Sequence, residues 1–205
     1  MSSKNLRVGV AMAAVLACAG VARADVGTGD GVRFRGGIAL EGGALIVPGA
    51  TLGAIGPIGH LGVQINNLIG VYLMPGFDVL FGPAGGVNFN GPVIVDFTFL
   101  DNRLTLGIGP DFGFYAAAGV SSNGKQATGV AGVQYGARGR IAFNAIVGIG
   151  ENGYRRKALV IALDLRALIG PAASATTNAN GTSSGTASTT AFGFAPMLSI
   201  GYEAF

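Results

Sequence analysis

The chain has no tryptophan, a single cysteine and a single histidine, and only 11% of its 205 residues are charged. One cysteine forms no disulfide within a chain. Zinc sites are built mainly from several histidine and cysteine ligands, which one histidine and one cysteine do not supply. The carboxylates are scattered singly rather than grouped for zinc or calcium. We therefore expect no metal centre and no cofactor.

Long hydrophobic runs are also missing. The longest apolar stretch, Val8 to Ala22, is shorter than the ~20 residues that a membrane-spanning helix needs. Lys4 and Arg7 precede this stretch and Ala22-Arg23-Ala24 ends it, which is the layout of a secretory signal peptide. We therefore predict a signal peptide over residues 1–24, cleaved after Ala24.

The cysteine offers a second interpretation of this segment. Cys18 follows Val15-Leu16-Ala17, which resembles the lipid-attachment sequence of bacterial lipoproteins. Lipidation at Cys18 is therefore the alternative to cleavage after Ala24. If cleavage follows Ala24, the mature chain has no thiol, so cysteine chemistry has no part in its fold or function.

Net charge disappears once the signal peptide is removed. The whole chain has 13 Lys and Arg against 10 Asp and Glu, but Lys4, Arg7 and Arg23 lie in the first 24 residues. The mature chain therefore has ten charges of each sign, and the apparent basicity belongs to the targeting segment. Because the usual argument from a basic chain to nucleic acid then lapses, we expect no nucleic-acid partner.

Hydrophobic residues are abundant, and they follow a period of two. In residues 93–100 the apolar side chains occupy alternate positions, with Asp96 and Thr98 between them. After Asp101-Asn102 the alternation resumes in residues 104–114 with the opposite parity. Period two indicates a strand with one apolar face, so the two segments predict a β-hairpin.

The same alternation over the mature chain predicts eight strands, at residues 33–43, 51–65, 68–81, 86–100, 103–117, 129–146, 154–169 and 190–205. Each is long enough to cross a membrane at a tilt, which takes ~9–11 residues. Short turns alternate with connections that are mostly longer, at residues 44–50, 82–85, 118–128 and 170–189, a pattern typical of outer-membrane barrels. The last connection, almost wholly Ala, Ser, Thr, Asn and Gly, is expected to be mobile and exposed.

We therefore expect an all-β fold: an eight-stranded antiparallel up-and-down transmembrane β-barrel over residues 33–205, in the outer membrane. Residues 25–32 are expected to form a periplasmic N-terminal segment. The alternative is a soluble β-sandwich or barrel whose apolar face points inward. Few charges would then remain to solvate its outer surface.

In a membrane barrel the second parity faces the lumen, and it collects five cations and six anions. A closed interior of low dielectric requires nearly equal numbers of positive and negative charges, because an unpaired charge there is costly. The predicted lumen network, structural in role, consists of Arg33, Arg35, Glu41, Asp78, Asp96, Asp111, Arg138, Arg140, Asp164, Arg166 and Glu203. His60, which shares this parity with Gln64, is predicted to be a hydrogen-bonded lumen residue.

The chain ends Leu198-Ser199-Ile200-Gly201-Tyr202-Glu203-Ala204-Phe205. A terminal phenylalanine after an alternating strand resembles the assembly signal of the small eight-stranded outer-membrane β-barrel proteins of bacteria. This resemblance implies two partners, outer-membrane lipid and the barrel assembly machinery.

Two features oppose the barrel prediction. Pro57, Pro92, Pro110 and Pro196 fall inside predicted strands, where a missing N–H breaks the ladder. Residues 155–169 are rich in Ala, Leu, Arg and Lys and fit a helix nearly as well as a strand.

Motifs for catalysis are weak. Gly148 to Gly153 matches the glycine pattern of dinucleotide-binding folds, but no acidic residue follows at about twenty positions and no βαβ units follow, so chance explains the match better. His60 has no nucleophile or carboxylate at a telling spacing, and the His-x-Ser pattern of outer-membrane deacylases is absent because Leu61 and Gly62 follow it. We expect no enzymatic activity.

Three functions remain open. The first is a noncatalytic integral barrel in envelope structure or surface interaction, with an unidentified surface ligand held by the 118–128 and 170–189 connections. The second is a narrow conduit for small solutes or apolar molecules, suggested by Gly and Ala on the polar parity. The third is a secreted soluble β protein that binds a hydrophobic ligand.

Overall fold

The structure, a computed structural model, describes residues 32–48, 50–66, 68–100, 103–120, 125–149, 156–178 and 183–204. The described residues form strands and no helix, which confirms the all-β prediction. The ten strands are β1 (Arg33–Val47), β2 (Ala50–Gln64), β3 (Ile69–Leu73), β4 (Gly76–Phe81), β5 (Gly85–Asn90), β6 (Val93–Phe99), β7 (Leu104–Val120), β8 (Gln126–Ile149), β9 (Arg156–Asn178) and β10 (Ser183–Ala204).

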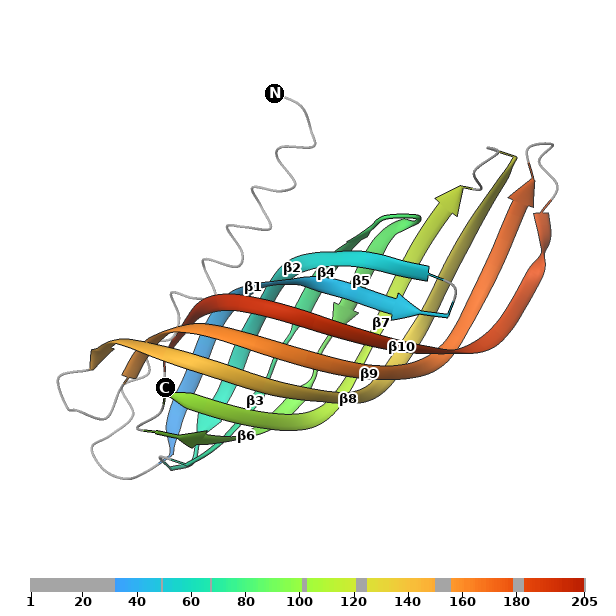
Figure 1. The fold of residues 1–205 in the computed structure, drawn as a ribbon. Coiled ribbons are helices and arrows are strands. Elements are labelled where there is room, and N and C mark those ends of the chain that lie inside the picture. The colour runs from blue at the N-terminus through green and yellow to red at the C-terminus, as the bar shows by residue number, and fades with distance from the viewer. Residues whose placement is uncertain are drawn as a thin grey trace.

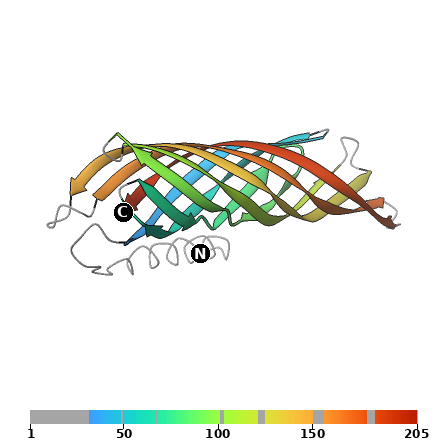
Figure 2. The same ribbon diagram turned by 90° about the horizontal axis from the view of Figure 1, so that it is seen from below.

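The strands make one antiparallel sheet arranged as a ring (Figure 1, Figure 2). β1 is hydrogen-bonded to β10 on one side and to β2 on the other, so first and last strands are neighbours. β3 and β4 both pair with β2, and β5 and β6 both pair with β7. Each of these two pairs therefore fills one position, and the ten strands occupy eight positions around the ring.

Proline explains why two predicted strands are divided. The predicted strand 68–81 is interrupted at Met74-Pro75, and the predicted strand 86–100 at Gly91-Pro92. The two interruptions lie side by side, because the Met74 N–H donates to the Pro92 carbonyl at 2.9 Å. The Gly59 N–H donates to the Pro75 carbonyl at 2.8 Å, so the wall continues across the break.

The other three prolines of the predicted strands, Pro57, Pro110 and Pro196, lie within strands at places where one neighbouring ladder lapses. The β1–β10 register passes from Gly43↔Met197 to Ile46↔Phe194, which leaves Pro196 without a β1 partner. The β2–β4 register likewise skips Pro57. Pro110 lies between the parts of β7 that pair with β6 and with β5. A missing N–H is tolerated at such positions, so the prolines do not contradict a strand.

The prediction of a mobile connection over residues 170–189 is wrong for the described part of that segment. Residues 172–177 of β9 pair with residues 127–132 of β8, and β10 begins at Ser183. Pairing of backbone groups does not depend on apolar side chains, and Thr128 and Thr176 add a hydroxyl contact at 3.3 Å between β8 and β9. The predicted connections 44–50 and 118–128 are also shortened, because β1 reaches Val47 and β7 reaches Val120.

Strands β8, β9 and β10 continue past the β1–β2 hairpin. They extend the sheet at the end of the molecule that lies away from the C-terminal end of β10 (Figure 1). We call this part the extension: residues 126–133 of β8, 170–178 of β9 and 183–193 of β10. Its composition is Ala, Ser, Thr and Gly with few large apolar residues.

Residues 156–169 form the first part of β9, so the helical alternative is wrong for them. β9 pairs with β8 on one side and with β10 on the other, and this pairing overrides the helix propensity of Ala, Leu and Arg. Leu159, Ile161 and Leu163 are exposed, whereas Val160 and Ala162 between them are buried. The predicted signal peptide 1–24, Cys18, residues 25–31 and Phe205 lie outside the described residues.

Apolar side chains face outward around the ring. Val95 is 38% exposed and Leu106 is 41% exposed, whereas Asp96 and Thr105, their sequence neighbours, are fully buried. The same distribution holds on β8, where Tyr135, Ile141 and Phe143 are exposed and the polar residues between them are buried. The interior of the ring is therefore polar and the outer surface is apolar.

Candidate functional site

The charged interior is the candidate site. Of the eleven charged residues predicted for the interior, ten are buried, and Arg33, at the start of β1, is half-buried. They come from β1, β4, β6, β7, β8, β9 and β10, each from the inward parity of its strand. Period two brings these side chains to one face, and the ring brings the faces together.

The central cluster is built around Arg138 on β8. Its Nη2 donates to Glu41 Oε2 at 2.5 Å, and its Nε donates to Asp164 Oδ1 at 3.0 Å. Arg140 donates to the other oxygen of Asp164 at 2.7 Å. One carboxylate therefore bridges two arginines, and Glu41 joins them from β1.

Arg166 is the directly opposite neighbour of Arg138 in the β8–β9 ladder. Like charges in such positions repel, and carboxylates offset the repulsion here. Arg166 donates to Asp111 Oδ2 at 2.7 Å and lies 3.6 Å from Asp78 Oδ2. Asp78 also accepts hydrogen bonds from Asn88 at 2.8 Å and Asn90 at 3.2 Å.

A second cluster surrounds Arg35, nearer the C-terminal end of β10. Arg35 donates to Glu203 at 2.5 Å and to Asp96 at 2.6 Å. Its guanidinium carbon lies 4.5 Å from the centre of the Tyr72 ring, within the range of a cation–π contact. The cluster thus gives one arginine two carboxylates and an aromatic face.

His60 belongs to this second cluster. Its Nδ1 lies 3.4 Å from Glu203 Oε1, and its ring centroid lies 5.6 Å from that of Tyr72. The imidazole is buried, so it has no access to bulk solvent. The geometry is that of a packed interior side chain beside a carboxylate.

Uncharged polar residues also line the interior. Asn88 and Asn90, which the sequence analysis does not single out, bind Asp78. Gln134 donates to Asn88 at 2.6 Å, and Asn144 donates to Thr105 at 2.9 Å. The signal that identifies them is parity, since each lies on the inward face of its strand. Of the tyrosines, Tyr72 is inside, whereas Tyr135 and Tyr202 are exposed.

Glycine makes room for the second cluster at one position. A Cβ on Gly70 would lie 2.5 Å from Asp96 Oδ1, 2.7 Å from Arg35 Nη1 and 2.8 Å from Gln64 Oε1. Those distances are too short for a carbon atom, so a Cβ at this position would displace the ends of the three side chains. Gly70 therefore leaves room for the Arg35–Asp96 pair as it is packed.

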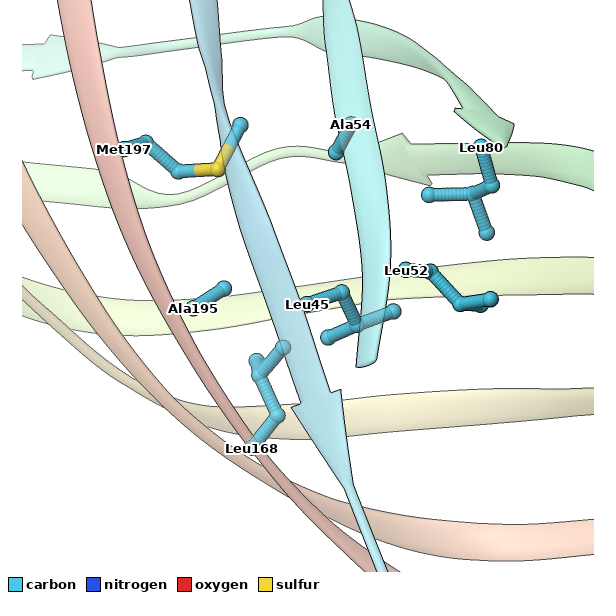
Figure 3. Close-up of a cluster of buried hydrophobic side chains, with 7 residues drawn as sticks. All are labelled: Leu45, Leu52, Ala54, Leu80, Leu168, Ala195 and Met197. Atoms are coloured by element: carbon cyan, nitrogen blue, oxygen red, sulfur yellow. The ribbon is translucent and has the colours of Figure 1, made fainter. Parts of the chain in front are cut away.

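An apolar layer lies in the interior on the side of the central cluster that faces the extension, as Leu168 follows Arg166 along β9. Figure 3 shows this layer, in which side chains from β1, β2, β4, β9 and β10 converge: Leu45, Leu52, Ala54, Leu80, Leu168, Ala195 and Met197. A second apolar group, Ala39, Ile58, Tyr72, Met74 and Ile94, packs elsewhere in the interior. Ions would have to pass close packing as well as paired charges.

A hollow lies beside the apolar layer, on the side of the extension. Its lining includes Leu45, Tyr115, Gln134 and Leu168, together with residues 169–170 of β9 and 191–193 of β10. Its volume of about 30 Å³ holds one or two water molecules.

Within the described ranges, His, Cys, Asp and Glu side chains form no group of three or more suited to a metal ion. None of the segments that the structure describes is a helix capable of crossing a bilayer. Gly148 and Ile149 end strand β8, and residues 150–153 of the glycine motif lie outside the described residues.

Comparisons with known proteins leave the family of this chain open. No family model matches the sequence, and no curated protein matches it significantly.

Proposed function

We propose that this chain is a noncatalytic integral β-barrel of the bacterial outer membrane, with a sealed interior, that serves envelope structure or surface contacts through its extension. The observation that supports the proposal is that exposed apolar side chains alternate with buried polar side chains along the strands. Outward apolar residues such as Ile108, Phe114 and Ile141 are more than half exposed, whereas Arg138, Asp164 and Glu41 are fully buried.

A protein in water has the reverse distribution, because apolar surface is stabilised by about 25 cal/mol per Å² when it leaves water. Large continuous apolar surfaces on folded proteins are typical of partner or membrane contacts. The exposed apolar side chains form a belt around the whole ring. Lipid acyl chains would cover all of this belt, whereas a single soluble ligand would cover only part of it. Lipid is therefore the proposed partner of the outer surface, in preference to the soluble alternative.

The outer membrane is the proposed location because residues 1–24 have the layout of an export signal and the strands form a ring with an apolar outer surface. Proteins that cross this membrane do so as closed barrels, in which every strand has two neighbours. The barrel assembly machinery is the corresponding proposed partner during insertion.

A conduit is the weaker candidate. Eight strand positions enclose an interior that side chains just fill. Here four buried arginines lie among six buried carboxylates, and an apolar layer lies beside them. Moving an ion past them would require breaking pairs in a medium of low dielectric, where an unpaired charge costs several kcal/mol.

Three measurements test the proposal together. The protein should fractionate with outer membranes and should run faster on gels unheated than after boiling, as folded barrels do. Pure protein in planar bilayers should show no resolvable single-channel current. Recovery in the soluble periplasm would contradict the membrane assignment, and a reproducible current would replace the sealed barrel with a conduit.

A further inference from the structure

Strand β10 has a long edge without a neighbour. It pairs with β9 from Ser183 to Ala204, whereas its pairing with β1 begins only at Phe194. Gly193 lies beside the end of β1, but among the described residues no strand pairs with the other side of Ser183–Phe192. The extension therefore ends on this side in a row of backbone groups that no described strand satisfies.

The direction of those groups follows from Pro196. A Cβ built on Gly43 of β1 would collide with the Pro196 carbonyl oxygen, so this carbonyl points toward β1. In an antiparallel sheet alternate residues direct both N–H and C=O to the same side. Because the β9 register is unbroken from Ala187 to Ala204, Ser188, Thr190 and Phe192 direct theirs to the free edge.

This edge lacks the usual protection. Natural edge strands carry lysine, proline or inward charges that prevent pairing with other chains. Residues 183–195 contain no charged residue and no proline. A bulge lies between Ser184 and Ala187, outside the regular stretch from Ala187 to Gly193. That regular stretch is a template to which an extended strand of another molecule can add.

We propose that the free edge of β10 pairs antiparallel with the same edge of a second copy of this protein. The pairing is isologous, with Thr189 on the two-fold axis and Ser188 opposite Thr190 of the partner. The choice of a second copy rests on charge. Residues 170–195 of both copies are uncharged, so identical edges approach without the repulsion that opposed like charges produce.

The pairing joins molecules in facing membranes, and in this respect it rests on the proposed function. All copies in one membrane run β10 in the same sense across the bilayer, so two of them cannot oppose these strands antiparallel. A copy anchored in a facing membrane runs its β10 in the opposite sense. The predicted contact is therefore tip to tip.

Vesicle clustering tests the inference. The protein is reconstituted into two populations of phosphatidylcholine vesicles with different fluorophores. Impermeant maleimide labelling of Ala131→Cys in a Cys18→Ser background selects preparations whose extension faces outward. Red and green vesicles should cluster when both carry protein and stay apart when only one does. Clustering with one population bare would overturn the inference in favour of binding to the lipid surface.

The double variant Ser188→Pro/Thr190→Pro removes two N–H donors from the free edge and none from the β9 ladder. Clustering should fall at least tenfold, while flotation with vesicles and heat-dependent gel mobility stay unchanged. Ser188→Ala/Thr190→Ala is the matched control and should cluster like the parent. Persistence of clustering in the proline variant would contradict the assigned edge. Loss of flotation in the parent would instead refute the membrane proposal.

A charge exchange tests the partner register. Vesicles with Ser188→Lys/Thr190→Lys should not cluster among themselves at low salt, and neither should vesicles with Ser188→Glu/Thr190→Glu. Mixing the two should restore clustering, because opposite charges then face each other across the new ladder. If the mixture stays dispersed, the two edges do not meet.

Discussion

Arg138 and Glu41 lie 97 positions apart in the sequence, yet their side chains meet at 2.5 Å in the interior of the ring, both fully buried. The two residues come from strands β8 and β1, which are not neighbours in the sheet. Their contact therefore crosses the interior and ties opposite parts of the wall together.

Removal of one partner from this pair should destabilise the fold strongly. Arg138→Met leaves Glu41 without its cation and removes one of two arginines from Asp164, and breaking a buried pair in this way costs about 3–5 kcal/mol. Arg138→Met/Glu41→Leu removes both charges and should recover more than half of that loss. The measurement is urea unfolding of the protein in lipid vesicles; a double variant as unstable as the sum of the singles would contradict the direct pairing.

Gly70→Ala should destabilise the protein because the new methyl group would displace the Arg35–Asp96 pair. Forced repacking of this kind typically costs about 1–3 kcal/mol. Gly139→Ala is the matched control, since a Cβ there meets nothing within 4 Å. Unfolding free energies of the two variants should therefore differ clearly, and equal values would mean that the second cluster tolerates displacement.

Leu106→Arg places a cation on the outward face. In a membrane barrel this change should cost about 2–4 kcal/mol near the bilayer centre. Ala131→Arg on the extension, which is also exposed, should have little effect because it lies beyond the proposed bilayer. If Leu106→Arg is neutral in vesicle-embedded protein, the apolar belt does not face acyl chains.

The sequence predicts features that depend on neighbouring residues, but it does not predict contacts between residues that are far apart in the chain. Alternation is local, so Val95 and Asp96 or Leu106 and Thr105 could be assigned to opposite faces without any knowledge of the fold. The contacts of Arg138 could not be assigned, because parity states which face a side chain occupies but not which of six carboxylates it meets.

Two errors have physical causes. The predicted strands 68–81 and 86–100 were treated as continuous, although Pro75 and Pro92 end their ladders side by side. The small polar composition around Ala173 predicts a mobile connection, although backbone pairing with β8 and β10 makes these residues strand. A composition poor in large apolar residues indicates that a segment buries little apolar surface. It does not indicate whether the backbone of that segment is paired in a sheet.

Labelling of single cysteines is the most direct test of the central claim, that the apolar parity faces lipid and the polar parity faces a closed interior. Cysteine is introduced at Phe97, Leu106, Thr98 or Thr105 in a Cys18→Ser background, and the folded protein is treated in membranes. A lipid-soluble maleimide should label Phe97→Cys and Leu106→Cys, and neither this reagent nor an impermeant one should label Thr98→Cys or Thr105→Cys rapidly. Rapid labelling of the threonine positions by the impermeant reagent, with the Phe97 and Leu106 positions protected, would contradict the account.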